Sequence, residues 1–144
     1  RDRDKVFQYS EEKGVTETVH FTGRKPMETM SRYLAASDVA LLILKDDPLF
    51  HITLPAKAQS YMACGIPILG CIKGESANLI EEAHCGVCCE SLSGKSLAEA
   101  ALKMYHMSKE ERVQMGRNAA EYSQKYFSKQ KLLDRLEEIM GELK

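Results

Sequence analysis

The fold of this chain follows first from one unbroken apolar run, Val39-Ala-Leu-Leu-Ile-Leu44. A run with no polar face is typical of a strand buried on both sides, so we expect it at the centre of a sheet. Outward from it, the same reasoning predicts buried strands at residues 66–71 and 86–89 and an earlier short strand at residues 19–22. Helical stretches separate the four strands, which predicts an α/β fold: a parallel, Rossmann-like sheet with helices on both faces.

The stretches between the expected strands carry apolar residues at helical spacing. We predict helices at Asp4–Lys13, Pro26–Ser37, Pro55–Cys64 and Ser76–Ala83. Beyond residue 96 the pattern predicts only helices, with Ser108 and Ser128 as N-caps and a capping box from Ser108 to Glu111. We therefore interpret residues 1–144 as one domain with a helical C-terminal tail over residues 96–144.

The number of strands is low for this kind of sheet. Doubly wound sheets commonly have six strands, and here only four are expected, the first of them after a helix. We therefore expect a partial domain whose N-terminal strands are missing. An unpaired sheet edge exposes backbone N–H and C=O groups to other chains, so we also expect self-association.

The composition excludes several classes of partner. Twenty Lys and Arg residues against 21 Asp and Glu residues leave a net charge of -1, so the chain lacks the basic footprint of a nucleic-acid-binding protein. The apolar runs are far shorter than the roughly 18 residues of a membrane-spanning helix. The N-terminal residues do not resemble an export signal, and we expect a cytoplasmic protein.

The five cysteines do not form a disulfide framework by number or spacing. Cys85, Cys88 and Cys89 form a C-x-x-C-C cluster that suggests zinc, but a closed zinc site needs about four ligands, and no second pair lies at suitable spacing. Free cysteine commonly behaves as a small hydrophobic residue. We therefore interpret the cluster as part of a buried strand.

The loops that follow the first three strands gather positive charge in an otherwise neutral chain. In an open α/β sheet, ligands bind at the carboxyl ends of the strands. These loops and the helix starts behind them carry Arg24, Lys25, Lys45, His51, Lys57 and Lys73. Together with free N–H groups at helix N-termini they suit a phosphate or diphosphate. The same lysines equally fit ordinary solvated loops, so charge alone leaves both interpretations open.

A family resemblance adds to this pattern. The stretch Tyr61-Met-Ala-Cys-Gly-Ile-Pro-Ile68 resembles the helix-to-strand signature of family 4 glycosyltransferases. Similar motifs precede and follow it in the family's order, at Val19–Arg24, Tyr33–Leu42, Gly74–Glu81 and Gly86–Cys89. The segment from Lys45 to Lys57 looks most like that of the bacterial members that build surface polysaccharides. The resemblance covers roughly residues 17–127.

The resemblance implies a GT-B enzyme, in which two Rossmann-like domains enclose the active site. This chain would be most of the C-terminal domain, which binds a nucleotide-diphosphate sugar, and its partner would be a missing N-terminal acceptor domain. No metal or other cofactor is expected. The full enzyme would lie in the cytoplasm, with peripheral association at the inner face of the membrane, and this chain alone would be inactive.

The resemblance also assigns donor-binding residues, although it assigns no catalytic residue. They are Gly23, Arg24, Lys25, Thr53, Leu54, Pro55, Lys57, Ser60, Gly74, Glu75 and Asn78. The loop before Lys57 would meet the diphosphate and the sugar, and Lys57 the phosphates. Ser60 and Asn78 stand where the family usually has glutamate. A serine hydroxyl is a weaker acceptor for ribose than a carboxylate.

Two alternatives remain open from the sequence. The chain could be a non-catalytic nucleotide-binding or regulatory domain of the same fold, because Ser60 removes expected site chemistry. It could also belong to a sugar-nucleotide epimerase of related architecture. The donor sugar, the base, the acceptor and the stereochemical outcome do not follow from the residues.

Overall fold

A computed structural model describes residues 3–90 and 92–142 of the chain. The chain divides after Met30 into two compact units, each of which is described by itself. The two ends of the expected domain, residues 1–2 and 143–144, and residue 91 lie outside the described residues.

The first unit contains one α-helix, α1 (Arg3–Glu12), followed by turns and loop as far as a short 3-10 helix, η1 (Met27–Thr29), at its end. The helix agrees with the predicted one and is followed by Gly14 at a φ of 64°. The ring of Phe21 contacts Phe7 of α1 edge to face, with 5.5 Å between centroids. The predicted strand at residues 19–22 is wrong, because these residues have no regular secondary structure.

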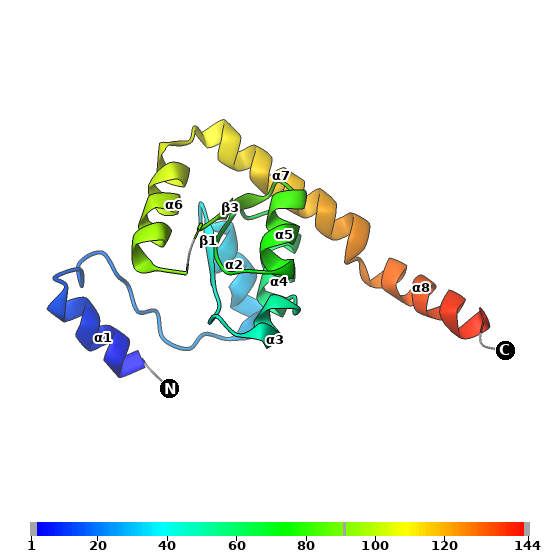
Figure 1. The fold of residues 1–144 in the computed structure, drawn as a ribbon, viewed down its shortest axis with the longest axis horizontal. Helices are drawn as coiled ribbons and strands as arrows, with labels where there is room; N and C mark the ends of the chain where they lie inside the picture. Colours follow the sequence, from blue (N-terminus) through cyan, green and yellow to red (C-terminus); the bar gives the residue numbers. More distant parts are fainter. Residues whose placement is uncertain (1–2, 91, 143–144) are drawn as a thin grey trace. The chain divides into compact units, whose positions relative to one another are not determined.

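A three-stranded parallel sheet forms the centre of the second unit within the described residues (Figure 1). Its strands are β1 (Ala40–Ile43), β2 (Ile68–Cys71) and β3 (Gly86–Cys88), in the order β1-β2-β3. Leu41 lies opposite Leu69, and Gly70 opposite Cys88. The predicted parallel α/β sheet is confirmed, but with three of the four expected strands, and the central one is β2.

Strand β1 is buried on one face only, which corrects the prediction that both faces are covered. Ala40 and Leu42 are buried, whereas Leu41 is 48% exposed and Ile43 55% exposed. All four residues of β2 are buried. The apolar run therefore indicated a strand correctly but did not reveal that one face of this strand is exposed.

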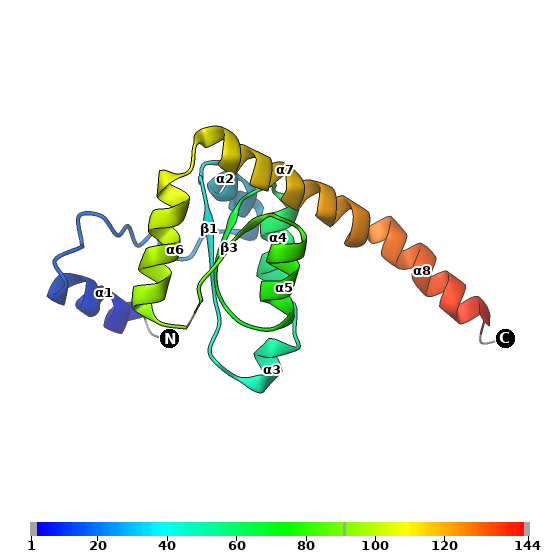
Figure 2. The same ribbon diagram turned by 45° about the horizontal axis from the view of Figure 1, so that its top comes forward.

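Helices cover both faces of the sheet, as predicted (Figure 2). On one face, α4 (Ala56–Ala63) and α5 (Glu75–Glu82) place Met62 and Ile80 in a core with Ile68. On the other face, α6 (Gly94–His106) packs Met104 against Leu69. The 3-10 helix η1 and α2 (Met30–Ala35) precede β1, close to the helix expected there.

Two more helices complete the predicted helical C-terminal region, α7 (Lys109–Tyr126) and α8 (Lys129–Glu142). Ser108 and Glu111 form the expected capping box at the start of α7. The Ser128 hydroxyl accepts from the Lys131 amide at 3.4 Å, as expected of an N-cap. Among the described helices, none combines the length and the apolar character that crossing a membrane requires.

Candidate functional site

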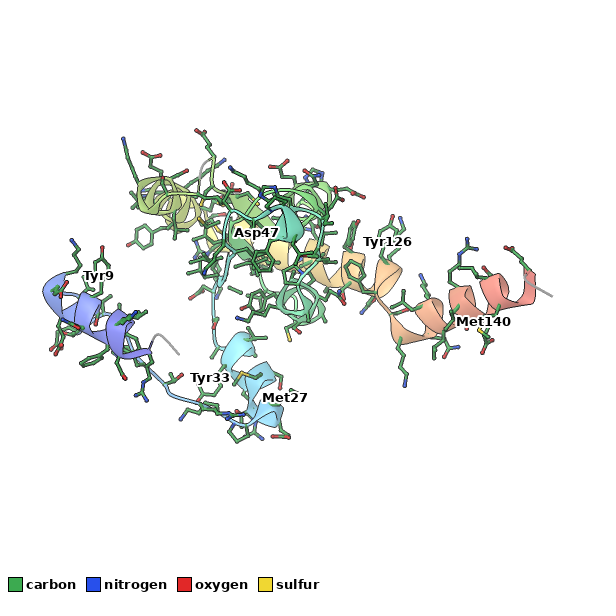
Figure 3. All side chains as sticks on the ribbon, turned by 60° about the horizontal axis from the view of Figure 1, so that its bottom comes forward. Tyr9, Met27, Tyr33, Asp47, Tyr126 and Met140 are labelled. Carbon is green, nitrogen blue, oxygen red and sulfur yellow. The ribbon has the colours of Figure 1, made fainter. Side chains whose placement is uncertain are left out.

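Two loops leave the carboxyl ends of β1 and β2 and lead into α4 and α5. The first loop contains a short helix, α3 (Pro48–His51), where the sequence suggested only a polar loop. Asp47, marked in Figure 3, caps this helix by accepting from the Leu49 amide at 2.9 Å. The proline at the first helical position is compatible with this start, because its missing N–H needs no partner there.

An acidic residue of the first loop holds both loops together. One carboxylate oxygen of Asp46 accepts from Lys73 Nζ at 2.8 Å, and the other lies 2.7 Å from His51 Nε2. The hydrogen bonds from Lys73 and then His51 lower the pKa of Asp46. Two of the basic residues expected at the ligand-binding rim, Lys73 and His51, are thus engaged with a carboxylate of the protein itself.

This tie should depend on pH in a defined way. Because the pKa of Asp46 is lowered in the folded protein, the stabilisation it contributes is present above the ordinary carboxyl pKa of about 3.9. It is lost as the pH falls further, through the lowered pKa. We expect Asp46→Asn to lower the unfolding midpoint at pH 7, and the difference from the unmodified chain to shrink below about pH 4.

Thermal unfolding followed by circular dichroism across this pH range provides the measurement. Asp47→Asn is the matched control, since asparagine caps a helix about as well as aspartate. A constant difference between Asp46→Asn and the unmodified chain down to pH 2 would contradict the ionic tie.

The two loops also touch through their backbones. The Ser76 hydroxyl, fully buried at the start of α5, donates to the Thr53 carbonyl at 2.9 Å. Gly74 has a φ of 73° and lies so close to His51 that a Cβ atom would come within 2.1 Å of the His51 carbonyl oxygen. The start of α5 is therefore held against the residues that precede α4.

Both helix starts carry unused backbone donors. Pro55 is the N-cap of α4 and Gly74 that of α5, and neither cap has a side-chain hydrogen bond to the helix. The first N–H groups of these helices are therefore available to a ligand, at the positive ends of their dipoles. Proline at the N-cap, rather than at the first helical position as expected, leaves the N–H of Ala56 in place.

The side chains expected to meet the nucleotide lie on the exposed side of α4. Lys57 is exposed and takes part in none of the ion pairs found among residues 3–90 and 92–142. Ser60 is also exposed, and its hydroxyl donates to the Ala56 carbonyl at 2.9 Å. Only the lone pairs of the Ser60 oxygen therefore remain for a ribose hydroxyl.

The other residues of the donor set divide into two groups. Gly23, Arg24 and Lys25 belong to the first unit, so their assignment to the donor site stays a prediction. Glu75 and Asn78 lie on α5 and line a pocket that also includes residues of α7. Sequence reasoning missed the α7 contribution.

This α5–α7 pocket has a volume of about 430 Å³. Leu54 contributes from the loop before α4, and Tyr122 and Tyr126 from α7. The spacing of the two tyrosines, four residues apart on a helix, is the signal that could have indicated a shared face. Figure 3 marks Tyr126 on the last turn of α7.

The cysteine cluster belongs to the interior rather than to a metal site. Cys85 is fully buried, while Cys88 and Cys89 are half-buried and pack against the two cores. Burial raises the pKa of Cys85 to about 11 and, with the charge of Glu81, that of Cys88 to about 12. Within the part of the chain that the structure describes, no three His, Cys, Asp or Glu side chains gather as metal ligands.

Comparisons with known proteins agree with this architecture. The family model described as "Glycosyl transferases group 1" matches residues 1–122. The sucrose-phosphate synthase of Thermosynechococcus elongatus matches 99% of this chain with a TM-score of 0.81 at 19% identity, a similarity of fold alone. The structure of WaaG, a glycosyltransferase involved in lipopolysaccharide biosynthesis, matches 85% of the chain with a TM-score of 0.67 at 26% identity.

The chain spans about a third of these two proteins, 34% of the first and 31% of the second. None of the curated proteins matches the sequence. The comparisons confirm the Rossmann-like α/β fold found in GT-B glycosyltransferases. Membership of family 4 and the surface-polysaccharide subgroup stays a prediction.

Proposed function

Because this chain belongs to the glycosyl transferases group 1 family, we propose that it is the donor-binding part of a GT-B glycosyltransferase. Its ligand is a nucleotide-diphosphate sugar, and its product enters polysaccharide or glycoconjugate biosynthesis. The acceptor is bound by another domain, so this chain by itself is inactive. The family favours a transferase over an epimerase.

One observation carries the proposal: two uncapped helix N-termini, of α4 and α5, meet at the carboxyl edge of the sheet. Departure of a nucleoside diphosphate from a sugar develops negative charge on phosphate oxygens. Fixed N–H donors aimed at those oxygens stabilise that charge without reorganising during the reaction. Lys57, the second residue of α4, adds an exposed lysine to the same edge.

The ties between the loops support the required rigidity. Asp46 holds Lys73 and His51, and Ser76 holds Thr53, so the two helix starts keep a fixed separation. A site held in place before the ligand arrives loses less entropy on binding. In this proposal Lys73 positions the site through Asp46, while Lys57 contacts the diphosphate.

Lys57 and Ser60 should respond differently to replacement. Lys57→Ala should weaken a nucleoside diphosphate by about 1 to 3 kcal/mol, the size of a hydrogen bond to a charged group, and leave the uncharged nucleoside nearly unchanged. Ser60→Glu should tighten the nucleoside itself, because a carboxylate accepts two ribose hydroxyls. Calorimetry on the intact protein with UDP, GDP, ADP and their nucleosides measures both effects.

The matched control is Lys109→Ala. Lys109 is an exposed lysine at the start of α7, in a pocket with Asp38 and Pro67, which precede β1 and β2 at the opposite end of the strands. Its loss should not change nucleotide affinity. Equal losses for nucleoside and diphosphate in Lys57→Ala, or weaker nucleoside binding in Ser60→Glu, would contradict the proposed site. Tight nucleotide binding by an intact protein without transfer activity would favour the regulatory alternative.

A further inference from the structure

The α5–α7 pocket combines residues expected at the donor site with residues of α7 that the donor site does not include. Glu75, Asn78 and Glu82 lie on α5 at intervals of three, four and seven residues, and therefore on one face of that helix. Facing them are Tyr122 and Tyr126 on α7. One wall thus offers carboxylates and an amide, and the other offers aromatic rings.

Side chains of α5 and α7 contact each other across the pocket. The Tyr122 hydroxyl donates to Glu82 Oε1 at 3.2 Å, and the Tyr122 ring lies 4.4 Å from that of Tyr126. Burial and the bond to Glu82 raise the pKa of Tyr122, so its phenol stays a donor at neutral pH. Tyr126 is 43% exposed, and its ring can contact a ligand.

The pocket continues along the same two helices as a groove. A second hollow of about 370 Å³ shares Glu82 and both tyrosines with the first and extends to Asn118 and Glu121. Its volume and that of the first, about 430 Å³, each lie in the range of small-ligand sites. The two hollows together are called the α5–α7 groove, and the hydrogen-bonded pair Tyr122 and Glu82 lines both of them.

The charges of the groove select against a phosphate. Glu75, Glu82 and Glu121 line it, against one lysine, Lys125, and one histidine, His84. The Lys125 ammonium lies over the Tyr126 ring at 4.8 Å and so occupies one side of that ring. A nucleoside diphosphate would meet an excess of like charge here, in contrast to the helix starts of the donor site.

A neutral sugar fits the aromatic rings, the carboxylates and the amide that line the groove. The C–H face of a pyranose is apolar and slightly positive, and it contacts the negative face of an aromatic ring favourably. Sugar hydroxyls donate to carboxylates and exchange two hydrogen bonds with a side-chain amide. The exposed Ile52 at the rim and the half-buried Leu54 add apolar surface.

From this juxtaposition we propose that the α5–α7 groove binds a neutral carbohydrate. Tyr126 contacts a sugar ring through the part of its own ring that Lys125 and Tyr122 leave exposed, while Asn78 and Glu75 bond the sugar hydroxyls. Glu75 and Asn78, which the family resemblance placed at the donor, are assigned to this ligand instead. The groove adjoins the start of α5, where the donor diphosphate is proposed to bind, and it is tested by its own variants at Asn78 and Tyr126.

The test uses the chain itself, titrated with maltose and with cellobiose and followed by NMR of backbone amides and the Asn78 side-chain amide. We expect shifts confined to α5 and the end of α7, with a Kd on the order of 1 mM. Tyr126→Ala and Asn78→Ala should each weaken binding about fivefold or more. Tyr105→Ala, which removes an exposed tyrosine of α6, should leave binding unchanged.

The outcomes separate the ligand classes. Absence of shifts with both sugars, or affinities that neither groove variant changes, would overturn the proposal. A tetralysine peptide that shifts the groove residues when the sugars do not would replace it with a basic-peptide site. If UDP changes the NMR signals of Asn78 more strongly than the sugars do, Asn78 belongs to the donor site. If UDP changes only the signals from the starts of α4 and α5, the groove is a separate site.

Discussion

Replacing Gly74 with alanine is expected to lower the free energy of unfolding by at least about 3 kcal/mol. Gly74 has a φ of 73° and a ψ of -147°, a backbone region essentially restricted to glycine. The added Cβ atom would also lie 2.1 Å from the His51 carbonyl oxygen and 2.6 Å from the His51 Cα atom. Backbone atoms cannot move aside as the end of a flexible side chain does, so the loop before α4 must shift.

Urea denaturation measures this loss, and calorimetry with a nucleoside diphosphate should show weaker binding in the same variant. Gly94→Ala is the control, because a Cβ atom there meets nothing within 4 Å. We expect that variant to be as stable as the unmodified chain. Unchanged stability and nucleotide affinity in Gly74→Ala would show that the two loops do not pack as described.

Replacing Gly116 with alanine is expected to give the second large loss of stability, although alanine usually stabilises a helix relative to glycine. Alanine normally stabilises a helix interior by about 1 kcal/mol relative to glycine. In α7, however, a Cβ atom on Gly116 would come within 2.3 Å of the Gly65 carbonyl oxygen, which follows α4. We expect Gly116→Ala to destabilise the chain by about 3 kcal/mol because the helix must move away from the turn.

Gly141→Ala provides the matched comparison, a helical glycine in α8 whose added Cβ atom would meet nothing within 4 Å. It should raise the helical content or leave stability unchanged. Circular dichroism and urea denaturation of both variants make the comparison direct. A gain of stability in Gly116→Ala similar to that in Gly141→Ala would mean that α7 does not approach Gly65 closely.

Family membership could be anticipated from local sequence, because the motif from Tyr61 to Ile68 spans a helix end and a strand start. The donor assignment is less complete. Thr53 does lie against Ser76, and Gly74 against His51, at one edge of the sheet, since parallel strands end there together. The engagement of Lys73 by Asp46 could not be predicted, because the two residues are far apart in the sequence and pair only when both loops are placed.

The sequence by itself determined the elements whose signals are local. Helix α7 begins at a capping box that four consecutive residues encode, and β2 is apolar over its whole length. Only the tertiary structure decided which strands find partners. Residues 19–22 have a strand-like composition but form no strand, and β1 has the apolar run of a central strand but lies at one end of the strand order β1-β2-β3, with Leu41 exposed. A strand is completed by hydrogen bonds to another segment, so its presence and its burial depend on what the rest of the chain places beside it.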